Sequence, residues 1–111
     1  MGGRKEVAAA PCKVKISISR SADRDLLAGF RFYESQSSGV GHYFLDSLFA
    51  DIDSLILHAG IHRKVGGFYR LLSDRFPFAI YYKIEDSTVR IRRVLDCRRD
   101  PVWVSRQLKK G

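Results

Sequence analysis

Residues 76–101, FPFAIYYKIEDSTVRIRRVLDCRRDP, are the stretch on which the fold prediction depends. Apolar residues alternate with others in both halves of this stretch, which is the two-residue period of a strand with one buried face. The Asp-Ser pair at 86–87 separates the halves and predicts a tight turn. That turn places Ile84 opposite Val89, so the apolar side chains of both strands share one face. The stretch therefore predicts a β-hairpin.

The other face of this hairpin is predicted to be open and basic. In the same register Lys83 lies opposite Arg90, and Tyr81 lies opposite Arg92. Like charges directly opposite each other destabilise a sheet. An anionic partner would relieve the repulsion, so we expect this face to bind one. The residues predicted to lie on it are Ala79, Tyr81, Lys83, Arg90 and Arg92.

Length and charge limit the class of protein. The chain has 111 residues, of which 45% are hydrophobic and 29% charged, as in one soluble globular domain. The net charge is +8, and residues 88–111 hold eight Lys/Arg against two Asp. A basic carboxyl-terminal quarter indicates a nucleic-acid or acidic protein partner.

The amino terminus predicts neither export nor a membrane anchor. The apolar run at residues 7–10 is too short for a signal peptide, and no stretch is long enough to span a membrane. Cys12 and Cys97 are too far apart in sequence to suggest a metal-binding pair, and a domain of this size needs no disulfide. We therefore expect a cytoplasmic protein with a flexible extension over residues 1–12 and a single domain over residues 13–111.

Two helices are predicted before the hairpin. Residues 13–19 alternate as a half-buried strand, and Ser19 or Ser21 can cap a helix over about residues 22–34. Residues 35–41 break that helix. A second helix follows and ends at Gly60. Its apolar stripe is Val40, Phe44, Leu48, Ile52 and either Leu55 or Ile56.

These elements predict an α/β (α+β) domain in which a helical hairpin packs on a mainly antiparallel sheet of three to four strands. Glycines at 66–67 turn the chain into a strand over residues 68–73, with Leu71 facing the core and Arg70 on the open face. Beyond Pro101 the chain forms either a short helix or a strand-like tail.

The order of elements and four pieces of sequence resemble the RelE/ParE superfamily of bacterial type II toxins. The pieces are the spacing between Asp25-Leu26 and Phe32-Tyr33, HYFLDSL at 42–48, YRLLSDRFPFAIYYKI at 69–84, and RVLDCRRDP at 93–101. The resemblance covers about residues 13–103 and is closer to the ParE, or plasmid-stabilisation, branch. It implies a toxin that is neutralised by a co-encoded antitoxin in a hetero-oligomer, and it implies DNA gyrase as the target.

The RelE branch, by the same resemblance, cleaves mRNA on the ribosome with basic residues on neighbouring strands and a carboxyl-terminal tyrosine. Cations stabilise the charge on the scissile phosphate, and an acid or base moves the protons. Arg70 keeps the first basic position, but Leu72 and Ala79 stand where two others would lie. Trp103 stands near the tyrosine position, and an indole is no acid or base at neutral pH. If the chain is a ribonuclease, its catalytic residues are Arg70, Arg98 and Arg99.

Two further features carry alternatives. His58 and His62 have the spacing of two metal ligands on a helix, but Gly60 lies between them and no third ligand is near, so we predict no metal and no cofactor. Arg93 interrupts the apolar face of the last strand, which indicates a β-bulge or an ion pair with an acidic residue such as Asp46 or Asp96.

The sequence thus favours a toxin that inhibits its target by binding. A ribosome-dependent mRNA ribonuclease is the first alternative, and a basic nucleic-acid-binding module without toxic activity is the second. The predicted partners are an antitoxin and gyrase, or else the ribosome with its mRNA. The predicted target-binding residues are Arg70, Tyr81, Lys83, Arg90, Arg92, Arg98, Arg99 and Trp103.

Overall fold

The structure, a computed structural model, describes residues 14–110. Predictions for residues 1–12 and for Lys13 lie outside this range. The elements in chain order are β1 (Lys15–Ile18), α2 (Arg20–Gln36), α3 (Val40–Asp53), α4 (Leu55–His58), β2 (Lys64–Val65), β3 (Phe68–Leu72), β4 (Phe78–Glu85), β5 (Thr88–Asp96) and α5 (Pro101–Lys110).

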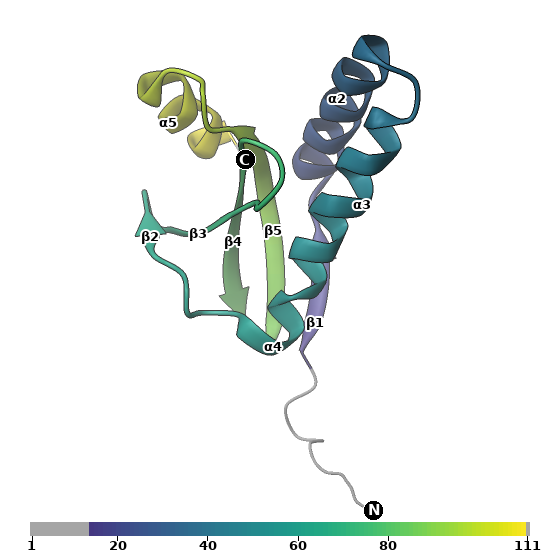
Figure 1. The fold of residues 1–111 in the computed structure, drawn as a ribbon. Coiled ribbons are helices and arrows are strands. Elements are labelled where there is room, and N and C mark those ends of the chain that lie inside the picture. The colour runs from purple at the N-terminus through teal and green to yellow at the C-terminus, as the bar shows by residue number, and fades with distance from the viewer. Residues whose placement is uncertain (1–13, 111) are drawn as a thin grey trace, which may run out of the picture.

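The fold is a five-stranded mixed sheet with helices on both faces, and it confirms the predicted α+β class. The strand order is β1-β5-β4-β3-β2, and all neighbours are antiparallel except β1 and β5. The helical hairpin of α2 and α3 packs along one side of the sheet, whereas α5 lies on the other (Figure 1). The prediction missed β2 and the parallel pairing of β1, which add strands to the two edges.

The β4–β5 hairpin forms in the predicted register near its turn. Asp86 and Ser87 have φ angles of 50° and 63°, the left-handed pair that suits a two-residue turn between twisted strands. Ile84 pairs with Val89, and Lys83 pairs with Arg90. The local sequence pattern therefore sets the closed end of the hairpin correctly.

A β-bulge changes the register farther along the hairpin. Tyr82 pairs with Ile91 but Tyr81 pairs with Arg93, so Arg92 is the extra residue. The prediction that Tyr81 lies opposite Arg92 is therefore wrong, and the bulge suggested by Arg93 is confirmed. Because the extra residue resets the alternation, Val94 takes the inward position and is 1% exposed.

The helix pair begins and packs where small and polar residues allow it. The Ser19 hydroxyl accepts a hydrogen bond from the Ala22 N–H at 3.1 Å and so caps α2. Helix α2 is longer than predicted and leaves a link of only three residues, 37–39. A Cβ at Gly29 would lie 2.5 Å from the Phe44 ring, and one at Gly41 would lie 2.7 Å from the Phe30 carbonyl oxygen. Only glycine permits so close an approach of α2 and α3.

The main core lies between this helical hairpin and the sheet. Of the predicted stripe, Phe44, Leu48 and Ile52 are buried, and of the two alternatives that follow Leu55 is buried, whereas Ile56 is 52% exposed. Gly60 has a φ of 93°, as expected of the residue that ends the helical segment. The buried residues of this core are Ala22, Leu26, Phe44, Leu48, Ile52, Leu55, Phe78, Ile80, Tyr82, Val89, Ile91 and Val94.

A second, smaller cluster lies on the opposite face of the sheet. The chain beyond Pro101 is a helix rather than a strand-like tail, and this α5 covers Ala79 and Tyr81. The face predicted to be open is therefore covered over these two residues, which are 0% and 4% exposed. The buried residues of this cluster are Phe68, Ala79, Tyr81, Leu95 and Leu108. Within residues 14–110, no helix has the length and apolar character to cross a bilayer.

Candidate functional site

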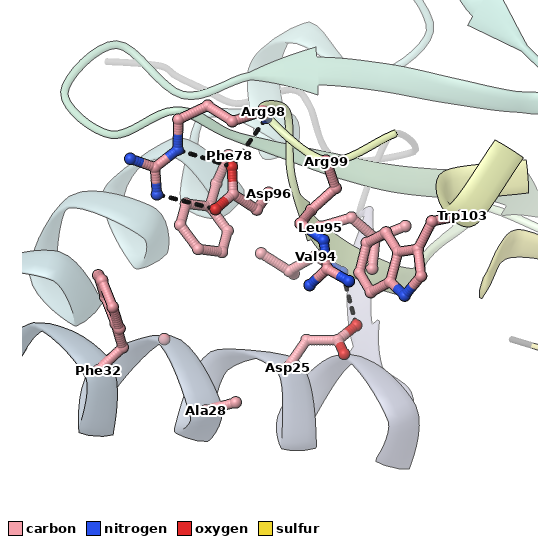
Figure 2. A pocket seen from close by; sticks show the side chains of 11 residues that line it. Asp25, Ala28, Phe32, Phe78, Val94, Leu95, Asp96, Arg98, Arg99 and Trp103 are labelled. Carbon is pink, nitrogen blue, oxygen red and sulfur yellow. Dashed lines mark hydrogen bonds and ion pairs between the residues drawn. The ribbon is translucent and has the colours of Figure 1, made fainter. Parts of the chain in front are cut away.

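A groove lies between α2 and the end of β5 with the chain that follows it (Figure 2). Its volume is about 410 Å³. One wall comes from α2 and the other from residues that connect β5 to α5. The lining residues are Asp25, Ala28, Gly29, Phe32, Phe78, Val94, Leu95, Asp96, Arg98, Arg99 and Trp103.

Helix α2 supplies an apolar wall with one carboxylate at its end. Asp25, Ala28 and Phe32 are spaced three and four residues apart, so they lie on one face of the helix. Ala28 is exposed, and the Phe32 side chain, at 50% exposure, stands at the open end of the groove. A half-exposed phenylalanine beside a small residue leaves apolar surface that a partner side chain can cover.

An ion pair marks the opposite rim of the groove. The Arg98 Nε and Nη2 donate to the two Asp96 carboxylate oxygens at 3.0 and 2.8 Å, and the Arg98 backbone N–H donates to Asp96 at 2.8 Å. These hydrogen bonds hold the pKa of the Asp96 carboxyl below its usual value. The Arg98 side chain is 58% exposed, so it can change partner at little cost.

Arg99 and Trp103 form the third part of the rim. The Arg99 guanidinium lies 3.9 Å from the centroid of the Trp103 ring, which is a cation–π contact. Trp103 is half-buried and packs against the smaller cluster. The prediction that tryptophan serves both packing and recognition stays a prediction, and its partly buried position is compatible with both roles.

Arg99 also lines a second pocket, of about 240 Å³, on the other side of this rim. Arg70 and Tyr81, paired across β3 and β4, lie in the same pocket. Burial raises the pKa of the Tyr81 hydroxyl despite a hydrogen bond from Arg70. Desolvation likewise raises the pKa of the Cys97 thiol. Both groups are therefore protonated at neutral pH.

Three predicted residues lie apart from both cavities. The Lys83 ammonium lies 4.7 Å from the centroid of the Phe68 ring, and Arg90 pairs with Glu85 at 2.7 Å. Arg92 is half-buried, and its carbonyl oxygen accepts a hydrogen bond from the Ser19 hydroxyl at 2.9 Å. The target-binding residues predicted on the hairpin are thus separated. Tyr81 lines the second pocket, whereas Lys83, Arg90 and Arg92 line neither the groove nor that pocket.

The positions that matter for RNA cleavage lie side by side but lack the required chemistry. Leu72 pairs directly with Ala79, next to the pair of Arg70 and Tyr81. Ala79 is fully buried, and Leu72 is 52% exposed. Of these four side chains, only Arg70 is cationic and only Tyr81 can donate a hydroxyl proton, from a buried site. The arrangement suits binding better than acid–base catalysis.

Sequence reasoning missed the contribution of α2 and the partner of Arg93. The Arg93 guanidinium pairs with Asp25 at 2.7 Å, and neither Asp46 nor Asp96 is its partner. The signal was present, because a cation that the sequence pattern places at a core-facing position requires a carboxylate nearby. That carboxylate lies 68 residues away in sequence. No comparable feature of the sequence indicates that Ala28 lines the groove.

The two histidines do not converge on a common site. His62 Nδ1 lies 2.5 Å from the hydroxyl oxygen of buried Tyr82, and Gly60, which separates His62 from His58, donates its N–H to the same oxygen at 3.0 Å. Burial lowers the pKa of the His62 ring. In the part of the chain that the structure describes, no three His, Cys, Asp or Glu side chains gather as metal ligands would.

Comparison with known proteins agrees with this geometry. The fold is similar to that of a chain in a solved structure of the chromosomal ParDE TA system from P. aeruginosa, which superimposes with a TM-score of 0.69. That chain is 20% identical, and the alignment covers 75% of this chain and 95% of the other. None of the curated proteins matches significantly. Residues 16–101 match the family described as the ParE toxin of the type II toxin-antitoxin system, parDE. The chain therefore belongs to the ParE toxin family.

Proposed function

We propose that the chain is a toxin that inhibits bacterial growth by binding its target, with DNA gyrase as that target. The observation that carries this proposal is the pair formed by Leu72 and Ala79, which leaves Arg70 without the second and third cations that RNA cleavage requires. Trp103, at the place of the tyrosine, cannot transfer protons. A rim of exposed Arg98 and Arg99 with half-buried Trp103 instead suits recognition of a protein surface.

The second half of the proposal concerns neutralisation by an antitoxin. An acidic, amphipathic antitoxin segment fits the groove, because its apolar residues can cover Ala28 and Phe32 while its carboxylates meet Arg98 and Arg99. The net charge of +8 favours such a partner. Since apolar contact shares the binding energy with charge, the toxin–antitoxin hetero-oligomer resists moderate salt. Both partners act in the cytoplasm.

Ribosome-dependent mRNA cleavage is the second candidate, and one observation favours it. Arg70 and Arg99 line the same pocket, and Tyr81, the strand partner of Arg70, lines it as well. Two guanidinium groups can hold a phosphate. The missing acid or base makes this candidate the weaker one.

The deciding experiment measures two activities of one purified protein. Supercoiling by gyrase is followed with wild type, with Arg99→Ala and with the control Arg24→Ala, an exposed arginine of α2 that does not line the groove. We expect wild type and the control to inhibit, and Arg99→Ala to inhibit at least roughly tenfold less. Arg70→Ala and Arg92→Ala should leave the fold intact and weaken inhibition less.

The same preparations are added to a translation reaction and the mRNA is analysed by primer extension. Discrete cuts within codons that disappear in Arg70→Ala would favour the ribonuclease instead. Salt-sensitive binding to any nucleic acid, without inhibition or cleavage, would favour the nucleic-acid-binding module. Absence of co-elution with the product of a neighbouring antitoxin gene at every ionic strength would contradict the proposed neutralisation.

A further inference from the structure

Arg93 is a buried cation in a position that the proposed function does not use. It is 8% exposed, and among residues 14–110 it is the one charged residue in the buried class. A guanidinium removed from water destabilises a protein unless its charge and its N–H groups all find partners. Its contacts therefore indicate what the residue is for.

On one side, Arg93 binds helix α2. Its Nε and Nη2 donate to the two Asp25 carboxylate oxygens at 2.7 and 2.9 Å, a bidentate pair. Asp25 also accepts the Val94 backbone N–H at 3.0 Å. The pairing of β1 with β5 ends at Ile18 and Ile91, so the Asp25 carboxylate takes the place of a neighbouring strand for Val94.

On the other side, Arg93 binds the end of helix α5. Its Nη1 donates to the Gln107 carbonyl oxygen at 2.8 Å, and its Nη2 lies 3.2 Å from the Gln107 Oε1. Gln107 is among the last four residues of α5, whose carbonyl groups have no partner within the helix. A cation at this end also interacts favourably with the helix dipole. Arg93 therefore caps α5.

Helix α5 has few other attachments. Leu108 is its one buried residue, at 7% exposure, and Trp103 and Val104 are only partly buried. A short helix with such a small apolar contact depends on polar contacts for its exact placement.

We propose that Arg93 is the positioning residue of the groove. One guanidinium holds Asp25 of α2 and Gln107 of α5 together, so it fixes the distance between the helix that carries Ala28 and the helix that carries Trp103. Arg93 thereby sets the width of the groove and the orientation of its rim, without touching a partner itself. The proposed function enters this inference only through the growth-inhibition readout described below.

The test separates the placement of α5 from the stability of the sheet. Arg93→Lys keeps the charge but lacks the planar fork, so it cannot hold both helices. Gln107→Ala removes one contact on the α5 side alone. Asp25→Asn combined with Arg93→Met removes the pair without leaving a buried charge, and it replaces Arg93→Lys if that variant does not fold. The control is Arg90→Lys, on the same strand in an exposed pair.

Two measurements report the result. Hydrogen exchange compares the amides of α5 with those of β4, and acrylamide quenching follows Trp103, the only tryptophan of the chain. We expect exchange in α5 to rise roughly tenfold or more in Arg93→Lys, and less in Gln107→Ala, because charge-assisted hydrogen bonds to α5 are lost. Exchange in β4 should stay at its wild-type rate, and Trp103 should be quenched more. Arg90→Lys should change neither.

Two results would overturn the inference. Equal loss of protection in α5 and β4 would make Arg93 a general part of the core, and unchanged protection in both would mean that it positions nothing. Growth inhibition is measured in parallel. If α5 is released but inhibition remains at its wild-type level, the positioning role stands and the proposed target surface on α5 fails.

Discussion

The two faces of the sheet are covered in different ways. Within residues 14–110, the buried core cluster on the side of α2 and α3 has twelve residues, and that on the side of α5 has five. Figure 1 shows these helices on opposite sides of the sheet. The first face is closed by aliphatic and aromatic packing. On the second face, α5 is held by its buried residue Leu108, the Arg93 contacts and the cation–π pair of Arg99 and Trp103. The difference indicates that the first face supplies the stability and the second supplies the adjustable surface.

Aromatic packing explains the strength of the first face. The Tyr33 ring lies 5.2 Å from that of Phe44 and 4.8 Å from that of Phe76, and the Phe44 ring lies 4.9 Å from that of Phe78. Such contacts add to the free energy of burial. Glycine at residue 29 lets the Phe44 ring approach the axis of α2.

The largest effect is expected from a cavity in this first face. Phe44→Ala removes a fully buried ring and should lower the free energy of unfolding by about 3–5 kcal/mol. Phe32→Ala, on the exposed side of α2, is the matched control and should change it by no more than about 0.5 kcal/mol. Urea denaturation followed by circular dichroism measures both. Equal losses in the two variants would contradict the division of roles between the faces.

Removal of α5 should have the second-largest effect. A chain that ends at Asp100 loses the cover over Tyr81 and Leu95 and should unfold about 2–4 kcal/mol more easily. The first face should keep it soluble and folded. We expect it to bind antitoxin through α2 and to lose growth inhibition. An unfolded chain, or one that is fully toxic, would show that the faces are not separable in this way.

Local sequence pattern predicted the hairpin and suggested a bulge at Arg93 as one of two alternatives, but it did not identify the partners of Arg93. The alternation around the turn sets the pairing of Ile84 with Val89, because period and turn length are local properties. Next to the bulge at Arg92, Arg93 contacts Asp25 and Gln107, which are distant in sequence. Charge and periodicity cannot indicate which of several carboxylates comes close.

Only one side of the candidate site was predicted from the sequence. Arg98, Arg99 and Trp103 are neighbours in sequence, and the structure places them around one groove. The second wall lies on α2. Its side chains are small or exposed, and the sequence pattern does not distinguish them from an ordinary solvent-exposed helix face. Tyr81 was expected on an open surface, but α5 buries it. The sequence left the direction of the tail undetermined, so this burial was not predicted.

Trp103→Ala tests how far the second face contributes to stability. The indole is only partly buried, so we expect a loss of about 1–2 kcal/mol, less than for a fully buried aromatic ring, together with loss of growth inhibition. Val102→Ala, at a 57% exposed neighbour, is the control. A loss as large as that of Phe44→Ala would make Trp103 a core residue, and normal inhibition would remove it from the target surface.

The smallest effect concerns two carboxyl groups on the side of α2 and α3, Asp96 at the end of β5 and Asp51 on α3, and it is opposite in sign for the two. Hydrogen bonds from Arg98 lower the pKa of Asp96, so its ionised form adds stability above the usual Asp pKa of about 3.9, and this is lost as the pH falls through the lowered pKa. Desolvation raises the pKa of Asp51 on α3, so its ionisation removes stability as the pH rises through the raised pKa. Asp96→Asn should therefore lower the Tm at pH 7 and Asp51→Asn should raise it. The Asp51 difference should fade as the pH falls below the usual Asp pKa, and the Asp96 difference should fade only below its lowered pKa. Shifts of the same sign at pH 7, measured by calorimetry, would contradict the opposite contributions expected of these two carboxyl groups.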